Sequence, residues 1–137
     1  MFCALQLAEF RPHIPTLRDA GVDVAVIGSG APHFARGFKE QMQLDVPVYC
    51  DVELGTFKAA ALHRGLRYML NPAQLGRVRE ATQWFRVQLE GDATQQGGAL
   101  LVCPDGSVPF RHVNRWPGDH AHPETVVAAA LKAAMAR

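Results

Sequence analysis

The sequence predicts an α/β domain, with helices on both faces of a sheet and an antiparallel pair of strands at one edge. Three observations predict this class. Helical and strand-like segments follow one another in the order α, β, α, β, α, α, β-hairpin, α. Glycine or proline marks most of the boundaries between these segments. The chain has 137 residues, of which 48% are hydrophobic, and this suits one domain with a modest core.

The first predicted helix ends at Gly21 and should be bent. Its apolar residues recur at steps of three and four, which gives the helix one apolar face. These residues are Leu7, Phe10, Ile14 and Leu17. Pro12 and Pro15 each remove a backbone donor, so we expect a kink or a break in the helix rather than a straight rod.

Two units of strand and helix come next. Residues 22–27 form an apolar run typical of a strand, and a Gly-Ser-Gly turn then leads to a helix that begins at Pro32. Residues 46–50 predict a second strand, which Pro47 should keep short or at a sheet edge. Residues 53–63 predict the helix that follows this strand.

The remaining segments are a helix, a hairpin and a closing helix. Asn71 is a good cap for the helix that Pro72 would begin. Residues 99–103 and 108–113 flank a Pro-Asp-Gly-Ser turn, so we expect them to pair as an antiparallel hairpin. Residues 124–135 are rich in alanine and predict the last helix.

Charge and composition exclude several classes of protein. The net charge of +1 provides no basic surface for nucleic acid or for an anionic membrane. The sequence has no apolar run near the roughly 18 residues of a membrane span and no pattern typical of a signal peptide at its start. Three widely spaced cysteines argue against a disulfide framework. We therefore expect a cytoplasmic protein with at least one unpaired thiol.

Cys3 stands at the start of the first helix, where the helix dipole favours a thiolate. Three interpretations stay open: a small apolar residue near the terminus, a redox thiol that forms sulfenic acid, or a resolving cysteine whose partner lies outside the sequence. Cys50 and Cys103 each end an apolar strand. We expect both to fill the core and to be unreactive, because burial disfavours the thiolate.

Gly28 and Gly30 after a strand, with Asp51 after the next strand, resemble the opening of a dinucleotide-binding motif. His33 stands where the third glycine of the motif belongs, so we interpret the segment as a tight turn into a helix and expect no cofactor. A second pattern is a group of possible metal ligands whose spacing fits no common zinc site. The group consists of His112, Asp119, His120 and His122. We expect solvated loop histidines here and no metal.

Several segments, in their order along the chain, together carry a resemblance to a known family. They are residues 3–6 (CALQ), the helix over 12–21, 24–30 (VAVIGSG), 48–51 (VYCD), 91–98 (GDATQQGG), 104–106 (PDG) and 118–120 (GDH). Together they resemble the AhpC/TSA-like peroxiredoxins, and most closely the peroxiredoxin-like 2 branch, also described as AhpC/TSA antioxidant domains. The resemblance covers essentially the whole chain. It implies a single thioredoxin-like redoxin domain over residues 1–137.

The resemblance also implies thiol redox chemistry by a Cys-x-x-Cys pair, where a central strand meets the following helix. Cys3 corresponds to the second cysteine of that pair. The attacking cysteine and the central strand would lie before Met1, so the domain is expected to be incomplete at its N-terminus. Without that strand, the strand at 22–27 and the hairpin would lack the strand that the fold places between them.

In thioredoxin-like folds the loop before the hairpin faces the active thiol, and here that loop is rich in polar residues. The side chains expected to offer hydrogen bonds to a peroxide or another substrate are Thr94, Gln95 and Gln96. Gly97 and Gly98 would let the backbone approach closely. Gln6, one helical turn beyond Cys3, would orient the thiolate. The alternative is that the loop is a structural turn and that Gln6 is merely exposed.

Two classes of function follow from this. The first is a peroxiredoxin-like thiol oxidoreductase that reduces a peroxide or a disulfide, with a peroxide or a small thiol as substrate and an external thiol such as a thioredoxin as reductant. The alternative is a non-catalytic thioredoxin-like remnant, or a partner-binding module, whose open sheet edges another chain fills. The prediction includes no nucleic acid and no membrane partner, and it leaves a homodimer open.

Overall fold

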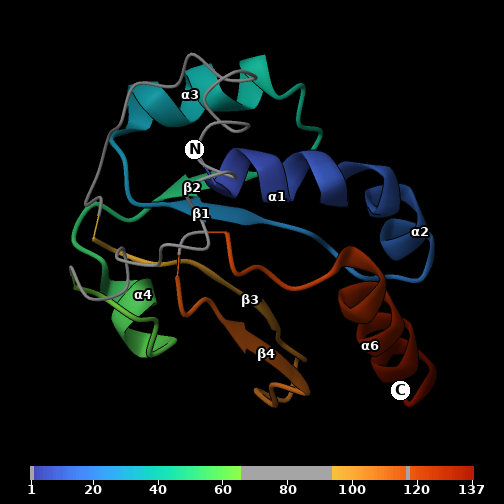
Figure 1. Ribbon diagram of the computed structural model, residues 1–137. Coiled ribbons are helices and arrows are strands. Elements are labelled where there is room, and N and C mark those ends of the chain that lie inside the picture. The colour runs from blue at the N-terminus through green and yellow to red at the C-terminus, as the bar shows by residue number, and fades with distance from the viewer. Residues whose placement is uncertain (1, 66–93, 117) are drawn as a thin grey trace.

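The computed structural model describes residues 2–65, 94–116 and 118–137 (Figure 1). The helix expected from Asn71 lies outside these residues. The elements, in chain order, are α1 (Phe2–Phe10), the 3₁₀-helix η1 (Arg11–His13), α2 (Ile14–Asp19), β1 (Val26–Gly28), α3 (Pro32–Gln41), β2 (Val48–Cys50), α4 (Gly55–Ala59), β3 (Gly98–Leu101), β4 (Phe110–Val113) and α6 (Pro123–Met135). The predicted starts of α3 and α6 are confirmed to within one residue.

The predicted bend in the first helix is confirmed. The segment divides into α1, η1 and α2, with Pro12 in η1 and Pro15 near the start of α2. A proline near the start of a helix removes an N–H that has no partner within the helix, so both prolines are placed where they cost least. The break turns α2 away from the axis of α1 (Figure 1).

β1 and β2 pair in parallel, and both are shorter than the sequence predicted. The expected strands at 22–27 and 46–50 are reduced to three residues each, Val26–Gly28 and Val48–Cys50. Pairing begins where the Val26 amide donates to the Pro47 carbonyl, at 2.9 Å. Pro47 has no N–H to continue the ladder, and this limits the strand at that end.

A hydrophobic core lies on one face of β1 and β2. It is built from the buried residues Ala4, Ile14, Met42, Leu44 and Val46, with Leu7, Phe10, Val24, Val26, Phe38 and Val48 packed against them. Residues from α1 and α3 therefore cover this face, as Figure 1 shows. On the strands' other face, Ile27 and Tyr49 are neighbours in register and remain exposed.

β3 and β4 form the predicted antiparallel hairpin, with strands again shorter than expected. Asp105 closes the turn by accepting hydrogen bonds from the backbone and the hydroxyl of Ser107. The hairpin packs against α6. Within the described residues, the strands form two separate pairs, β1 with β2 and β3 with β4, rather than one continuous sheet.

The helix predicted over residues 53–63 is only Gly55–Ala59. Ala61 has a φ of 52°, in the left-handed region, which ends the helix. The Arg111 guanidinium then donates to the carbonyls of Ala60 and Ala61, at 2.6 and 3.2 Å. A residue 51 positions away thus holds the helix end, and local sequence patterns do not contain this information.

Candidate functional site

Cys3 is the second residue of α1 (Phe2–Phe10), and its predicted redox role stays a prediction. The surroundings of the Cys3 side chain lie outside the described part of the structure. Ala4 is fully buried in the core, which anchors the first turn of α1. Gln6, one turn further on, is half-buried, and its predicted role toward the thiolate stays a prediction.

The loop of residues 94–97 is tied to two other segments by hydrogen bonds. The Thr94 carbonyl accepts from the Gly65 amide at 3.1 Å, and the Gln96 amide donates to the His63 carbonyl at 2.8 Å. On the other side, the Gly97 carbonyl accepts from the Asn114 amide at 3.0 Å. The backbone of this loop is therefore fixed before any substrate arrives, which a preorganised site requires.

The side chains of this loop are also engaged in holding it. Gln95 Nε2 donates to the carbonyls of His63 and Gln96, at 3.0 and 2.9 Å, and Gln96 is only 4% exposed. These bonds support the alternative that the loop is a structural turn. A direct role of Thr94, Gln95, Gln96 and Gly97 in binding a substrate stays a prediction.

A second group of polar residues lies in the segment between β4 and α6. Asp119 Oδ2 accepts from the Arg115 amide and from Arg115 Nε, at 2.9 and 3.0 Å, and closes a tight turn. His112 Nε2 lies 2.9 Å from the Asp119 carbonyl oxygen. The Arg115 guanidinium stacks over the Trp116 ring at 4.4 Å. Asp119 thus accepts the side-chain hydrogen bonds that close this turn.

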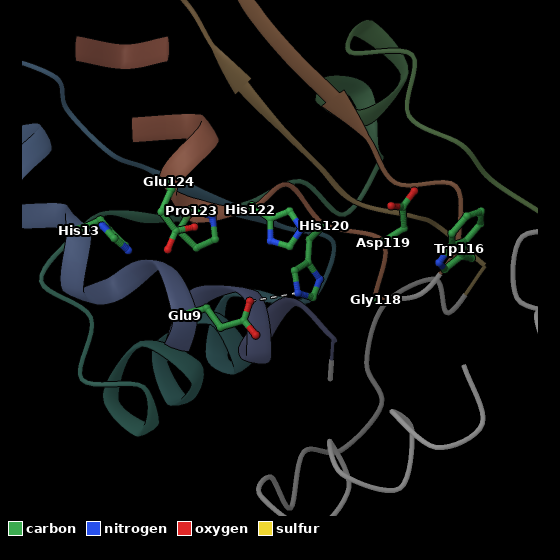
Figure 2. Close-up of a pocket in the computed structure, with 9 residues that line it drawn as sticks. All are labelled: Glu9, His13, Trp116, Gly118, Asp119, His120, His122, Pro123 and Glu124. Atoms are coloured by element: carbon green, nitrogen blue, oxygen red, sulfur yellow. Dashed lines mark ion pairs between the residues drawn. The ribbon is translucent and has the colours of Figure 1, made fainter. Parts of the chain in front are cut away.

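The same segment forms one side of an open cleft of about 530 Å³. Glu9 of α1 and His13 of η1 form the other side, and Trp116, His122 and Glu124 also line the cleft (Figure 2). Inside it, His120 Nε2 lies 3.4 Å from Glu9 Oε2. The cleft therefore joins α1, the helix that carries Cys3, to the segment before α6.

The expectation of solvated histidines is wrong for His120, whose side chain is 7% exposed. His112 is half-buried, and only His122 of the three is exposed. The His120 side chain lies beside Glu9 of α1, which is 111 positions away, so neither spacing nor composition indicates the contact. Among the residues that the structure describes, no group of three or more histidine, cysteine or acidic side chains is arranged to hold a metal.

Asp51, which resembled the acidic residue of a dinucleotide site, instead caps α4. Its carboxylate accepts hydrogen bonds from the amides of Gly55 and Thr56, at 3.1 and 2.7 Å, and from the Thr56 hydroxyl. The Thr56 hydroxyl and these amides hold the pKa of Asp51 below its usual value. Both carboxylate oxygens of Asp51 are therefore engaged at the start of α4.

Cys50 and Cys103 are unpaired thiols and are half-buried. The expectation that both fill the core is therefore wrong, because each side chain is only partly buried. Cys50 is the last residue of β2, whereas Cys103 lies in the turn after β3, because the hairpin strand ends at Leu101.

Among the described helices, none is long and apolar enough to cross a membrane.

Comparison with known proteins connects this geometry to a family. The family model described as AhpC/TSA antioxidant enzyme matches residues 9–115. The chain belongs to the AhpC/TSA antioxidant enzyme family. Membership confirms the thioredoxin-like fold inferred from the sequence resemblance. No solved structure gives a significant match to the chain.

The relatives of this AhpC/TSA chain support the peroxiredoxin-like 2 branch. Peroxiredoxin-like 2C of Mus musculus is 27% identical over 115 residues, covering 76% of this chain and 51% of the relative. Peroxiredoxin-like 2C of Homo sapiens is 26% identical with the same coverage, and that of Bos taurus is 27% identical over 116 residues. The chain thus spans about half the length of the curated relatives it matches.

The pH dependence of the unfolding free energy tests the structural role of the Asp119 carboxylate. Burial raises the pKa of Asp119, but the hydrogen bonds and charge of Arg115, with His112, hold it below its usual value. The stability that this carboxylate contributes is therefore present above about pH 4, the unfolded pKa, and is lost as the pH falls through the lower folded pKa. We expect Asp119→Asn to cost about 1 kcal/mol at pH 7 in urea unfolding, and less below pH 4.

Asp45→Asn is the matched control, because Asp45 pairs with Arg18 on the surface and its side chain is 89% exposed. This substitution should change the free energy of unfolding by less than about 0.5 kcal/mol at any pH. An equal loss for Asp119→Asn at pH 7 and at about pH 2 would contradict the assigned role of the charge.

Proposed function

We propose that this chain is a peroxiredoxin-like thiol oxidoreductase in which Cys3 is the redox thiol. The observation that carries the proposal is the position of Cys3 in the first turn of α1, in a member of the AhpC/TSA family. The start of a helix favours a thiolate because unpaired backbone N–H groups point toward it. A thiolate, and not a thiol, is the nucleophile that attacks a peroxide.

The proposed reaction has two stages. In the first, the Cys3 thiolate attacks one oxygen of a hydroperoxide, so that an S–O bond forms and the O–O bond breaks. Sulfur is oxidised to sulfenic acid, and the departing alkoxide or hydroxide takes up a proton. In the second, an external dithiol such as a thioredoxin attacks the sulfenic acid, releases water and forms a mixed disulfide, which its second thiol then resolves. A cytoplasmic location would supply such a reductant.

Peroxide titration of the purified chain, with sulfenic acid trapped and located by mass spectrometry, tests this function. We expect Cys3 to react about tenfold or more faster than Cys50 and Cys103, because a thiol of lowered pKa is largely thiolate at pH 7. Cys3→Ala should abolish the fast phase, and Cys50→Ala should leave it unchanged. Slow oxidation spread evenly over the three cysteines would refute the proposal.

A further inference from the structure

The contact between Glu9 and His120 joins two segments that lie far apart in the sequence. His120 Nε2 lies 3.4 Å from Glu9 Oε2, and the dashed line in Figure 2 marks this ion pair. Glu9 belongs to α1, and His120 belongs to the segment between β4 and α6. The His120 side chain is 7% exposed, whereas the Glu9 side chain is 45% exposed. A buried titratable group therefore lies where α1 meets this segment.

The segment that carries His120 is held in place by contacts of its own. Before His120, Asp119 Oδ2 accepts two hydrogen bonds from Arg115. After it, the His122 carbonyl accepts from the Thr125 amide at 3.0 Å, in the first turn of α6. The backbone on both sides of the imidazole is therefore fixed.

The contacts of α1 with the core do not depend on pH, in contrast to its contact with His120. Ala4, Leu7 and Phe10 join the hydrophobic core and carry no titratable group. Histidine has an ordinary pKa of about 6.5, and a carboxylate is already ionised where histidine titrates. The Glu9 carboxylate therefore attracts the imidazole by charge only while His120 is protonated.

Other titratable side chains also line this cleft. They are His13 of η1, Asp119 of the same segment, His122 just before α6, and Glu124 in the first turn of α6. Arg115 neutralises Asp119, so Glu9 and Glu124 are the carboxylates that favour a charged imidazole. His13 and His122 oppose it when they are protonated themselves. Glu9 is the carboxylate of this pair that forms the ion pair with His120.

We propose that Glu9 and His120 form a pH-sensitive tether between α1 and the segment before α6. The stability that this pair gives to α1 is present while His120 is protonated and is lost as the pH rises through the titration of His120. Solvent screens the half-exposed Glu9, so the expected change in the opening of α1 is about threefold. The inference does not depend on the redox function proposed for Cys3.

Hydrogen exchange of the full chain, followed by mass spectrometry, tests the tether. The observable is the protection of the α1 amides, which is the intrinsic exchange rate at each pH divided by the measured rate. We expect protection to be about threefold greater at about pH 5.5 than at about pH 8.5. Glu9→Gln keeps the size of the side chain and removes its charge, so it should abolish this difference by lowering protection at the lower pH. Equal protection of the unchanged chain at both pH values would overturn the inference.

Three control variants separate the tether from the general charge of the cleft. Glu124→Gln removes a carboxylate from the same cleft, but one that forms no ion pair with the described residues. His13→Gln and His122→Gln each remove one of the other imidazoles. All three variants should keep the difference in protection between the two pH values. If any of them abolished it as fully as Glu9→Gln does, the inference would be wrong.

A double variant tests whether Glu9 acts through His120. In a chain that already carries His120→Gln, the further change Glu9→Gln should leave the protection of α1 unchanged, because the partner of Glu9 has been removed. A further threefold loss in that chain would refute the tether, and so would a pH difference that survives in Glu9→Gln. Glu9 is exposed, so Glu9→Gln alone should fold as the unchanged chain does and gives a result without the buried substitution.

Discussion

Replacing Gly98 by alanine should destabilise the protein by about 3 kcal/mol. A Cβ atom at this position would lie 2.6 Å from the His112 carbonyl oxygen and 2.8 Å from Leu62 Cδ2. The Leu62 side chain can move, but the His112 oxygen belongs to the paired strand β4. The strands would have to separate, which weakens the pairing that also holds Gly97 against Asn114. Urea unfolding of the variant measures the loss.

Gly37→Ala is the matched control for this substitution. Gly37 lies inside α3, and a Cβ there would meet nothing within 4 Å. Alanine has a higher helix propensity than glycine, so this variant should be more stable by about 0.5–1 kcal/mol. If Gly98→Ala were as stable as the unchanged chain, β3 and β4 would have to be packed more loosely than the structure shows.

Leu17→Ala should cost about 3 kcal/mol of unfolding free energy, within the usual range of 2–5 kcal/mol for a buried leucine. Leu17 is 2% exposed and has the largest fully buried side chain among the described residues. It lies in α2, which packs against α6. Alanine keeps the helix propensity, so the loss would come from the cavity and from lost apolar burial. Thermal or urea unfolding gives the value.

Met135→Ala controls for the removal of a large apolar side chain. Met135 ends α6 and is 86% exposed, so its truncation should change stability by less than about 0.5 kcal/mol. A loss below about 1 kcal/mol for Leu17→Ala would contradict the packing of α2 against α6. A large loss for Met135→Ala would instead indicate that the end of α6 is buried in an assembly.

The order of elements and several of their boundaries could be predicted because local residues determine them. Pro12 and Pro15 break the first helix wherever that helix packs, since neither can donate a backbone hydrogen bond. Proline also opens α3 and α6, where its missing N–H costs nothing. The family resemblance rested on the same local runs, and the family match confirms it.

The candidate site was predictable only in part. Cys3 lies in α1 and the polar loop lies directly before β3, but the roles that the sequence assigns to these residues stay predictions. It did not predict that Gln95 would hold the loop to His63, or that His120 would be buried beside Glu9. Gln95 and His63 are 32 positions apart in the sequence, and Glu9 and His120 are 111 positions apart. Local sequence patterns do not predict contacts between residues so far apart.

The sequence by itself determined the α/β order, the bent first helix, the hairpin and the family, because each depends on residue type and short-range spacing. Tertiary structure decided where elements end and which polar groups are buried. Arg111 holds the end of α4, and His120 is buried beside Glu9 of α1. The physical reason is that a hydrogen bond or a buried side chain depends on its neighbours in space, and only folding brings these neighbours together.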